Sequence, residues 1–407
     1  MSFNPLKEKG IPLEKQIESW QQVNPEPYDK DQVHPYTRTR IILMNGIEVE
    51  AAIFKHQFAR HCSDPDINKQ LALTRAIEQQ QQKVVNWLSP ANESTLEVTI
   101  GYEQVAVDLT AGLARTEKDP NVKAALDFAL LEDFDHLYRY ANLMETVENK
   151  QAQKNVRDLT EIMPGRPTAS EHRHPFDNLR TPVDYQTADI LTKLHILTIV
   201  SGEQQTMNFY MNVGNRAATM IGRALYQEIG QVEEEHVSHY ESLADPTSTW
   251  FERLVLHEYN ECYLYYSNLE SEVDNRIKKI WQHHLEQEIA HLHLAVELLK
   301  QYDGMDPAEI LPDKLPELTI FQSNVDYVRD ILKNQIDLTC DGFDYVDSNE
   351  LSANHRFHKH QEIINSGIVP SQEVIQEQIE KNGIDYRLEL AGEHPVERFR
   401  QRQEVLV

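Results

Sequence analysis

Glutamate and histidine stand three residues apart in the segment 225–240, which contains no proline and is predicted to be helical. Glu233 and His236 would therefore project from the same face of that helix. Carboxylate oxygens and imidazole nitrogens are ligands that iron and manganese accept, and helical bundles present them at this spacing. The pair predicts a metal-binding helix face, and a solvated charged face is the alternative.

The same pattern recurs along the chain, as an acidic residue followed at one fixed distance by acid-x-x-His or acid-x-x-Gln. The copies are Glu48 with Glu78 and Gln81, Glu103 with Asp133 and His136, Glu203 with Glu233 and His236, and Glu258 with Glu288 and His291. The offset between copies one and two equals that between copies three and four. These equal offsets predict the tandem duplication of a unit of two helical hairpins. Glutamine in place of histidine marks the first copy as degraded.

Turn residues and prolines divide the chain into five parts. They are an irregular N-terminal arm (1–40), helical hairpins one and two (41–148), an extended proline-rich crossover (149–183), hairpins three and four (184–303) and a mixed C-terminal extension of unknown role (304–407). Ser94 and Glu97 form a capping-box pattern at the start of hairpin two. The C-terminal extension is more polar, and one short helix is predicted at 371–381. The predicted fold class is all-α.

Composition restricts the function classes. The chain has 407 residues, a net charge of −27 and three scattered cysteines. The negative charge disfavours nucleic acid and anionic membranes as partners. No apolar run approaches the ~18 residues of a membrane span, and the N-terminus has no apolar segment typical of a secretory signal. Because the cysteines form no Cys-x-x-Cys pair, we expect a reducing, cytoplasmic location and no rubredoxin-type iron site. The oligomeric state stays open.

With these motifs, residues 41–303 resemble the ferritin-like di-iron carboxylate superfamily. The resemblance implies four-helix bundles, a long crossover between paired hairpins, and the ligand order Glu, Glu-x-x-His, Glu, Glu-x-x-His. Pairing of hairpins two and three across the crossover would give the ligands Glu103, Asp133, His136, Glu203, Glu233 and His236. Asp133 stands where that family has glutamate, so the neighbouring Glu132 is a second candidate.

A competing arrangement pairs hairpins three and four, because the joint between them is short. The ligands would then be Glu203, Glu233, His236, Glu258, Glu288 and His291. All six are of the expected residue types, whereas the long crossover favours the first arrangement. The sequence leaves both open, and hairpin three belongs to each.

The leading expectation is an oxidoreductase that holds two iron ions, or alternatively manganese, and reacts with O₂ or peroxide. A small organic molecule is the expected substrate. Since the chain has no cysteine pair for a second iron site, electrons would come from an external donor or from the substrate. The alternative is a non-catalytic helical scaffold or binding protein whose metal site is structural or lost.

Overall fold

The computed structural model describes residues 3–157, 159–162, 172–335 and 337–383. Eight long helices dominate it and confirm the all-α class. They are α1 (Pro35–His61), α2 (Pro65–Asn86), α3 (Thr95–Thr116), α4 (Pro120–Glu148), α6 (Ile190–Val213), α7 (Met220–Glu241), α8 (Trp250–Ser271) and α9 (Asn275–Tyr302). Consecutive members pack against each other as the four expected hairpins.

Short loops with aspartate caps fix three of these hairpins. Asp64, Asp119 and Asp274 are the N-caps of α2, α4 and α9, and each side chain accepts hydrogen bonds from two backbone N–H groups of the first helical turn. Such bonds satisfy donors that a helix start leaves without partners. The expected capping box of Ser94 and Glu97 is present at α3, and Thr249 with Glu252 forms its counterpart at α8.

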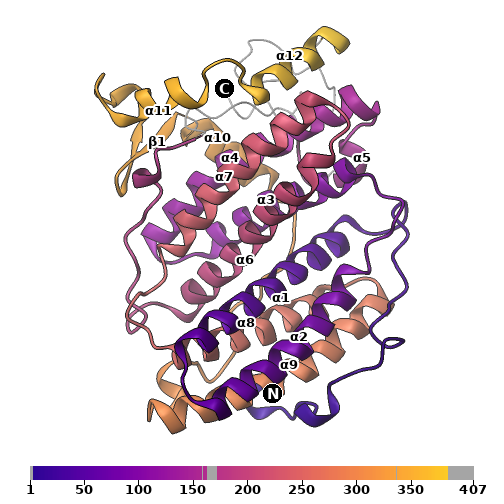
Figure 1. Ribbon diagram of the computed structural model, residues 1–407, viewed down its shortest axis with the longest axis vertical. Helices are drawn as coiled ribbons and strands as arrows, with labels where there is room; N and C mark the ends of the chain where they lie inside the picture. The colour runs from indigo at the N-terminus through magenta and orange to yellow at the C-terminus, as the bar shows by residue number, and fades with distance from the viewer. Residues whose placement is uncertain (1–2, 158, 163–171, 336, 384–407) are drawn as a thin grey trace.

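The hairpins gather into two groups of four helices (Figure 1). Helices α3, α4, α6 and α7 form one, here called bundle A. Helices α1, α2, α8 and α9 form the other, bundle B. The chain therefore pairs hairpin two with hairpin three through the long crossover, and hairpin one with hairpin four. The alternative bundle of hairpins three and four is wrong.

The two bundles meet where α1 packs against α6 and α3. Gly46 lies at a close approach of α1 to α6, because a Cβ atom there would stand 2.8 Å from the carbonyl oxygen of Ser201 on α6. A larger residue would push the two helices apart.

The N-terminal arm ends earlier than predicted. Residues 35–40 belong to α1, because His34 caps that helix and Pro35 occupies its first turn, where a missing N–H costs nothing. The remainder of the arm carries two short 3₁₀ helices, η1 (Pro5–Lys7) and η2 (Leu13–Lys15), which lie along α9.

The crossover holds the short helix α5 (Gln153–Val156) and the 3₁₀ turn η3 (Pro175–Asp177). Most of its described residues are otherwise non-helical, as its prolines predicted. Residue 158 and residues 163–171 lie outside the described part of the chain.

The C-terminal extension packs on bundle A through contacts of α10 (Val325–Gln335) with α4 and of α12 (Pro370–Asn382) with α4 and α7. Helix α12 confirms the helix expected at 371–381. Helix α10 and the antiparallel hairpin of β1 (Leu338–Asp341) and β2 (Asp344–Asp347) were not predicted. The extension also contains η5 (Pro307–Glu309), η6 (Ser348–Glu350) and α11 (Arg356–Ile364).

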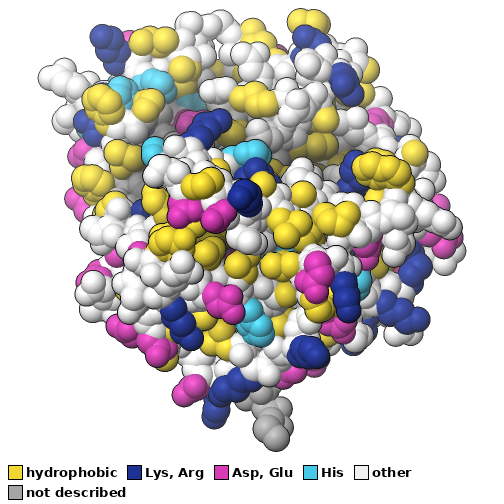
Figure 2. Space-filling view, turned by 60° about the horizontal axis from the view of Figure 1, so that its bottom comes forward, with side chains coloured by type: hydrophobic (Ala, Val, Ile, Leu, Met, Phe, Trp, Pro, Cys, Tyr) yellow, Lys and Arg dark blue, Asp and Glu magenta, His cyan; other side chains and the backbone are white. Residues whose placement is uncertain are grey.

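The surface mixes charges of both signs. On the face in Figure 2, acidic, basic and histidine side chains are scattered among apolar and uncharged ones. No helix in the described ranges combines the length and the apolar character that crossing a membrane requires.

Candidate metal centre

Bundle A brings together the six residues expected from the long-crossover pairing. They are Glu103 on α3, Asp133 and His136 on α4, Glu203 on α6, and Glu233 and His236 on α7. No more than 1% of any of these residues is exposed. The side chains form two adjoining groups, Glu103 with His136 and Glu233, and Asp133 with Glu203 and His236. We call these six residues cluster A.

Glu233 lies between the two groups. One of its carboxylate oxygens is 3.1 Å from Nδ1 of His136, and the other is 3.4 Å from Nδ1 of His236. Nδ1 of His236 also lies 3.5 Å from Asp133 and 3.5 Å from Glu203. Four carboxylates and two imidazoles therefore converge on one small buried volume.

The structure separates the roles of Asp133 and Glu132. Asp133 faces the cluster and accepts a hydrogen bond of 2.9 Å from the Thr110 hydroxyl. Glu132 lies behind it, with a carboxylate oxygen 2.8 Å from Nε2 of His236 and an ion pair to the buried Arg173. Glu132 is thus placed to orient His236 and not to join the two groups.

Cluster A leaves buried polar atoms without hydrogen-bond partners among the described residues. Each of its six side chains contributes at least one such atom, including both oxygens of Glu203, Nε2 of His136 and Nδ1 of His236. Buried polar groups without partners are costly, so an arrangement of this kind needs either protons or a cation. Hard carboxylate oxygens with imidazole nitrogens fit a pair of divalent iron or manganese ions.

The electrostatics of the metal-free cluster support the same requirement. Burial and the charge of Glu233 raise the pKa of Glu103 well above its usual value, and burial with Asp133 does the same to the pKa of Glu203. Burial raises the pKa of Asp133 to about 6. Burial opposes ionisation of Glu233 too, yet the adjacent imidazoles of His136 and His236 hold its pKa below the usual range. A bound cation would supply the missing positive charge.

Tyrosines line one side of cluster A. The Tyr210 hydroxyl donates a hydrogen bond to Glu103, and its ring packs against Tyr140 and Tyr226. The hydroxyl groups of Tyr140 and Tyr240 are buried without hydrogen-bond partners in the described chain.

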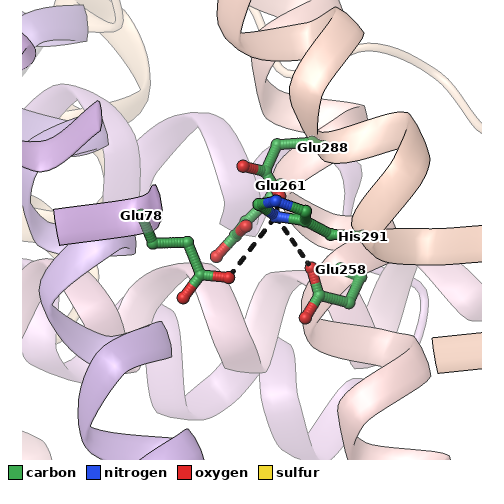
Figure 3. Close-up of side chains that lie close together, drawn as sticks. All are labelled: Glu78, Glu258, Glu261, Glu288 and His291. Carbon is green, nitrogen blue, oxygen red and sulfur yellow. Dashed lines mark hydrogen bonds and ion pairs between the residues drawn. The ribbon is translucent and has the colours of Figure 1, made fainter. Parts of the chain in front are cut away.

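The remaining predicted ligands, Glu258, Glu288 and His291, lie in bundle B with Glu78 and Glu261 (Figure 3). These five residues form cluster B. His291 is 3.0 Å from Glu288, 3.5 Å from Glu78 and 3.9 Å from Glu258. They do not join hairpin three.

Sequence reasoning missed two members of the bundle B site. Glu261 follows Glu258 by three positions, and Lys55 follows Glu48 by seven, so both spacings place the pairs on one helix face. The Lys55 ammonium is fully buried, 2.7 Å from Glu258 and paired also with Glu78. Burial opposes its charge, but Glu258, Glu261 and Glu288 raise the pKa of Lys55 above its usual value.

Comparison of the chain with models of protein families, with curated proteins and with solved structures found no significant match.

Proposed function

We propose that cluster A is a dinuclear iron or manganese centre and that the protein is an oxidoreductase reacting with O₂ or peroxide. The observation that carries the proposal is the convergence of four buried carboxylates and two histidines from four helices, each with polar atoms that lack hydrogen-bond partners among the described residues. This arrangement supports the ferritin-like interpretation of bundle A, and the equal offsets support duplication of the hairpin pairs.

In this proposal Glu103, His136 and Glu233 hold one ion, and Asp133, Glu203 and His236 hold the other. Glu233 contacts both histidines and would therefore be available to both halves of the centre. When bound, the two ions would supply Lewis acidity and the capacity for electron transfer. The protein contributes an enclosed site, fixed ligand positions and the Glu132 carboxylate that orients His236.

A small organic substrate is consistent with a cavity next to the centre. The cavity has a volume of about 520 Å³ and lies between α7, the crossover and the C-terminal extension. Arg173 forms part of its wall and pairs with Glu132, which contacts His236. Two side chains, Arg173 and Glu132, thus connect this cavity to His236, and the cavity gives a small molecule or an external electron donor a place to approach. We include a cytoplasmic location in the proposal.

The test is metal content after reconstitution with Fe²⁺ or Mn²⁺. We expect about two ions per chain in the wild type and a sharp loss in His236→Ala, because no neighbouring side chain can replace the lost imidazole. His239→Ala is the matched control, since His239 is equally buried on the same helix but pairs with Tyr345 instead of cluster A.

Full metal content in His236→Ala would overturn the proposal and favour a scaffold without a metal at cluster A. A metal that is present but unchanged by O₂ or peroxide would favour a structural centre. Formation of near-ultraviolet absorption on exposure of the ferrous protein to O₂ would support the oxidoreductase.

A further inference from the structure

The two clusters have the same construction at equivalent positions. Hairpin one corresponds to hairpin two, and hairpin four to hairpin three, with the same difference in residue number in both comparisons. The corresponding pairs are Glu48 and Glu103, Glu78 and Asp133, Gln81 and His136, Glu258 and Glu203, Glu288 and Glu233, and His291 and His236. Their surroundings correspond as well, because Tyr265 donates a hydrogen bond to Glu48 as Tyr210 does to Glu103. Differences between the clusters at equivalent positions can therefore be interpreted one residue at a time.

One half of the bundle B site contains a cation supplied by the chain. Glu78, Glu258 and His291 correspond to Asp133, Glu203 and His236, the three residues that form one half of cluster A. Between Glu78 and Glu258 lies the Lys55 ammonium, and none of its side chain is exposed. The ammonium takes the place among these carboxylates that a divalent ion would need.

The other half has lost its imidazole. Gln81 stands in place of His136 and donates a hydrogen bond of 2.6 Å to Glu288. An amide donor there satisfies a carboxylate oxygen that a metal ion would otherwise engage. Both halves of the bundle B site are therefore altered, each by a group that bonds directly to the carboxylates.

Bundle A carries a neutral group at the position of the ammonium. The shift between neighbouring hairpins makes Thr110 the counterpart of Lys55, and its hydroxyl donates to Asp133 and carries no charge. The shift between the two-hairpin units gives Tyr210 instead, whose hydroxyl donates to Glu103 and is also uncharged. A buried carboxylate cluster without a counter-charge is strongly disfavoured, and a buried ammonium or a metal ion can each provide one. Lys55 provides one such positive charge among the four glutamates of cluster B.

We propose that the Lys55 ammonium is the resident cation of the bundle B site, that this site holds no metal ion in the wild type, and that Lys55→Thr opens it to a divalent cation. The proposal concerns bundle B and does not depend on metal binding at cluster A.

The experiment counts Mn²⁺ bound per chain after incubation and gel filtration. We expect His291→Ala to bind as much Mn²⁺ as the wild type. Lys55→Thr should bind about one additional ion per chain, and Lys55→Thr with His291→Ala should lose that ion again. Lys55→Arg is the matched control, because it keeps a positive charge and should gain no Mn²⁺.

Thermal unfolding gives a second readout. Lys55→Thr should be less stable than the wild type in chelator, because buried carboxylates lose their counter-charge, and Mn²⁺ should restore part of the loss. If this variant does not fold without metal, refolding with and without Mn²⁺ makes the same comparison. A Mn²⁺ count that falls in His291→Ala would overturn the proposal, as would a Lys55→Thr variant that folds and gains none.

Both measurements are repeated in the His236→Ala background, which removes a cluster A ligand. Gain of Mn²⁺ on adding Lys55→Thr there supports the proposal for bundle B whatever happens at cluster A. If the proposal for cluster A is wrong, the wild-type protein itself should bind no Mn²⁺.

Discussion

At the scale of single residues, the buried histidines differ in what lies behind them. Nε2 of His236 contacts the Glu132 carboxylate, which pairs in turn with Arg173. Nε2 of His291 contacts instead the side-chain oxygen of Gln16 from the N-terminal arm. A carboxylate behind an imidazole makes it a stronger metal ligand than a neutral amide does. By this criterion His236 would be the stronger metal ligand of the two.

This difference gives a prediction for Glu132→Gln. The substitution keeps a hydrogen-bonding group beside His236 but removes its charge, so we expect metal affinity to fall about 10–100-fold while the number of sites is retained. Competition with a chelator of known affinity measures the change. Gln16→Ala is the control in bundle B and should leave affinity unaltered. If Glu132→Gln abolishes binding as fully as His236→Ala, then Glu132 is itself a ligand and its assigned role is wrong.

At the scale of elements, a carboxylate at the end of one helix ties it to the start of another. Glu117 follows α3 and accepts hydrogen bonds from Thr192 on α6 and from the backbone at 118 and 119, beside the His195 ring. Glu272 follows α8 as Glu117 follows α3, and it accepts a hydrogen bond from Thr37 on α1. Each bond joins two hairpins inside one bundle. The side chains of each cluster are therefore held in register by contacts near the loops as well as by core packing.

The pKa of Glu117 makes this contact testable by pH. Burial opposes its ionisation, but bonds from His195 and Thr192 outweigh burial and lower the pKa below 4.5. The carboxylate therefore stabilises the fold fully above that value, and the contribution disappears as the pH falls through the lowered pKa. Glu117→Gln should cost about 1–3 kcal/mol at neutral pH, because its buried partners lose an ionised acceptor.

Denaturant unfolding of the wild type and Glu117→Gln at pH 7 and at acid pH measures this effect. The difference between the two proteins should shrink as the pH falls below 4.5. A difference that stays constant over this range would mean that the charge of Glu117 does not stabilise the fold.

At the scale of the whole molecule, two bundles of similar construction are expected to respond differently to metal. In our proposal bound ions balance the charge of cluster A, whereas Lys55 supplies a cation in bundle B. The C-terminal extension reinforces bundle A, and Asp177 of the crossover pairs with Arg356 of α11. We therefore expect bound metal to stabilise bundle A and to leave bundle B largely unchanged.

Removal of metal tests that asymmetry. With metal at 100 times its dissociation constant, binding should stabilise the fold by about 2.7 kcal/mol. Chelation should increase amide hydrogen exchange in α3, α4, α6 and α7 much more than in α1, α2, α8 and α9. Equal increases in both bundles would show that metal binding is not confined to bundle A.

Much of this architecture is already determined by the sequence. Helical spacing, proline positions and capping residues specify the hairpins, because these are local preferences of the backbone. The fixed distance between the two acids of each copy selects the candidate ligands, since it places both legs of a hairpin at the same height. The sequence also places the degraded copy at Gln81, where a histidine is missing from an otherwise regular repeat.

Tertiary structure alone decides which hairpins pair, because a short joint and a long crossover each permit a bundle and only the packing of α3 against α6 and of α4 against α7 selects between them. It also separates Asp133 from Glu132, which are adjacent in the chain but face different surroundings once α4 is packed. Lys55 is the clearest case. Its charge suggests a solvated side chain, and only the folded bundle shows that it lies between Glu78 and Glu258, since long-range contacts decide which charges meet inside a core.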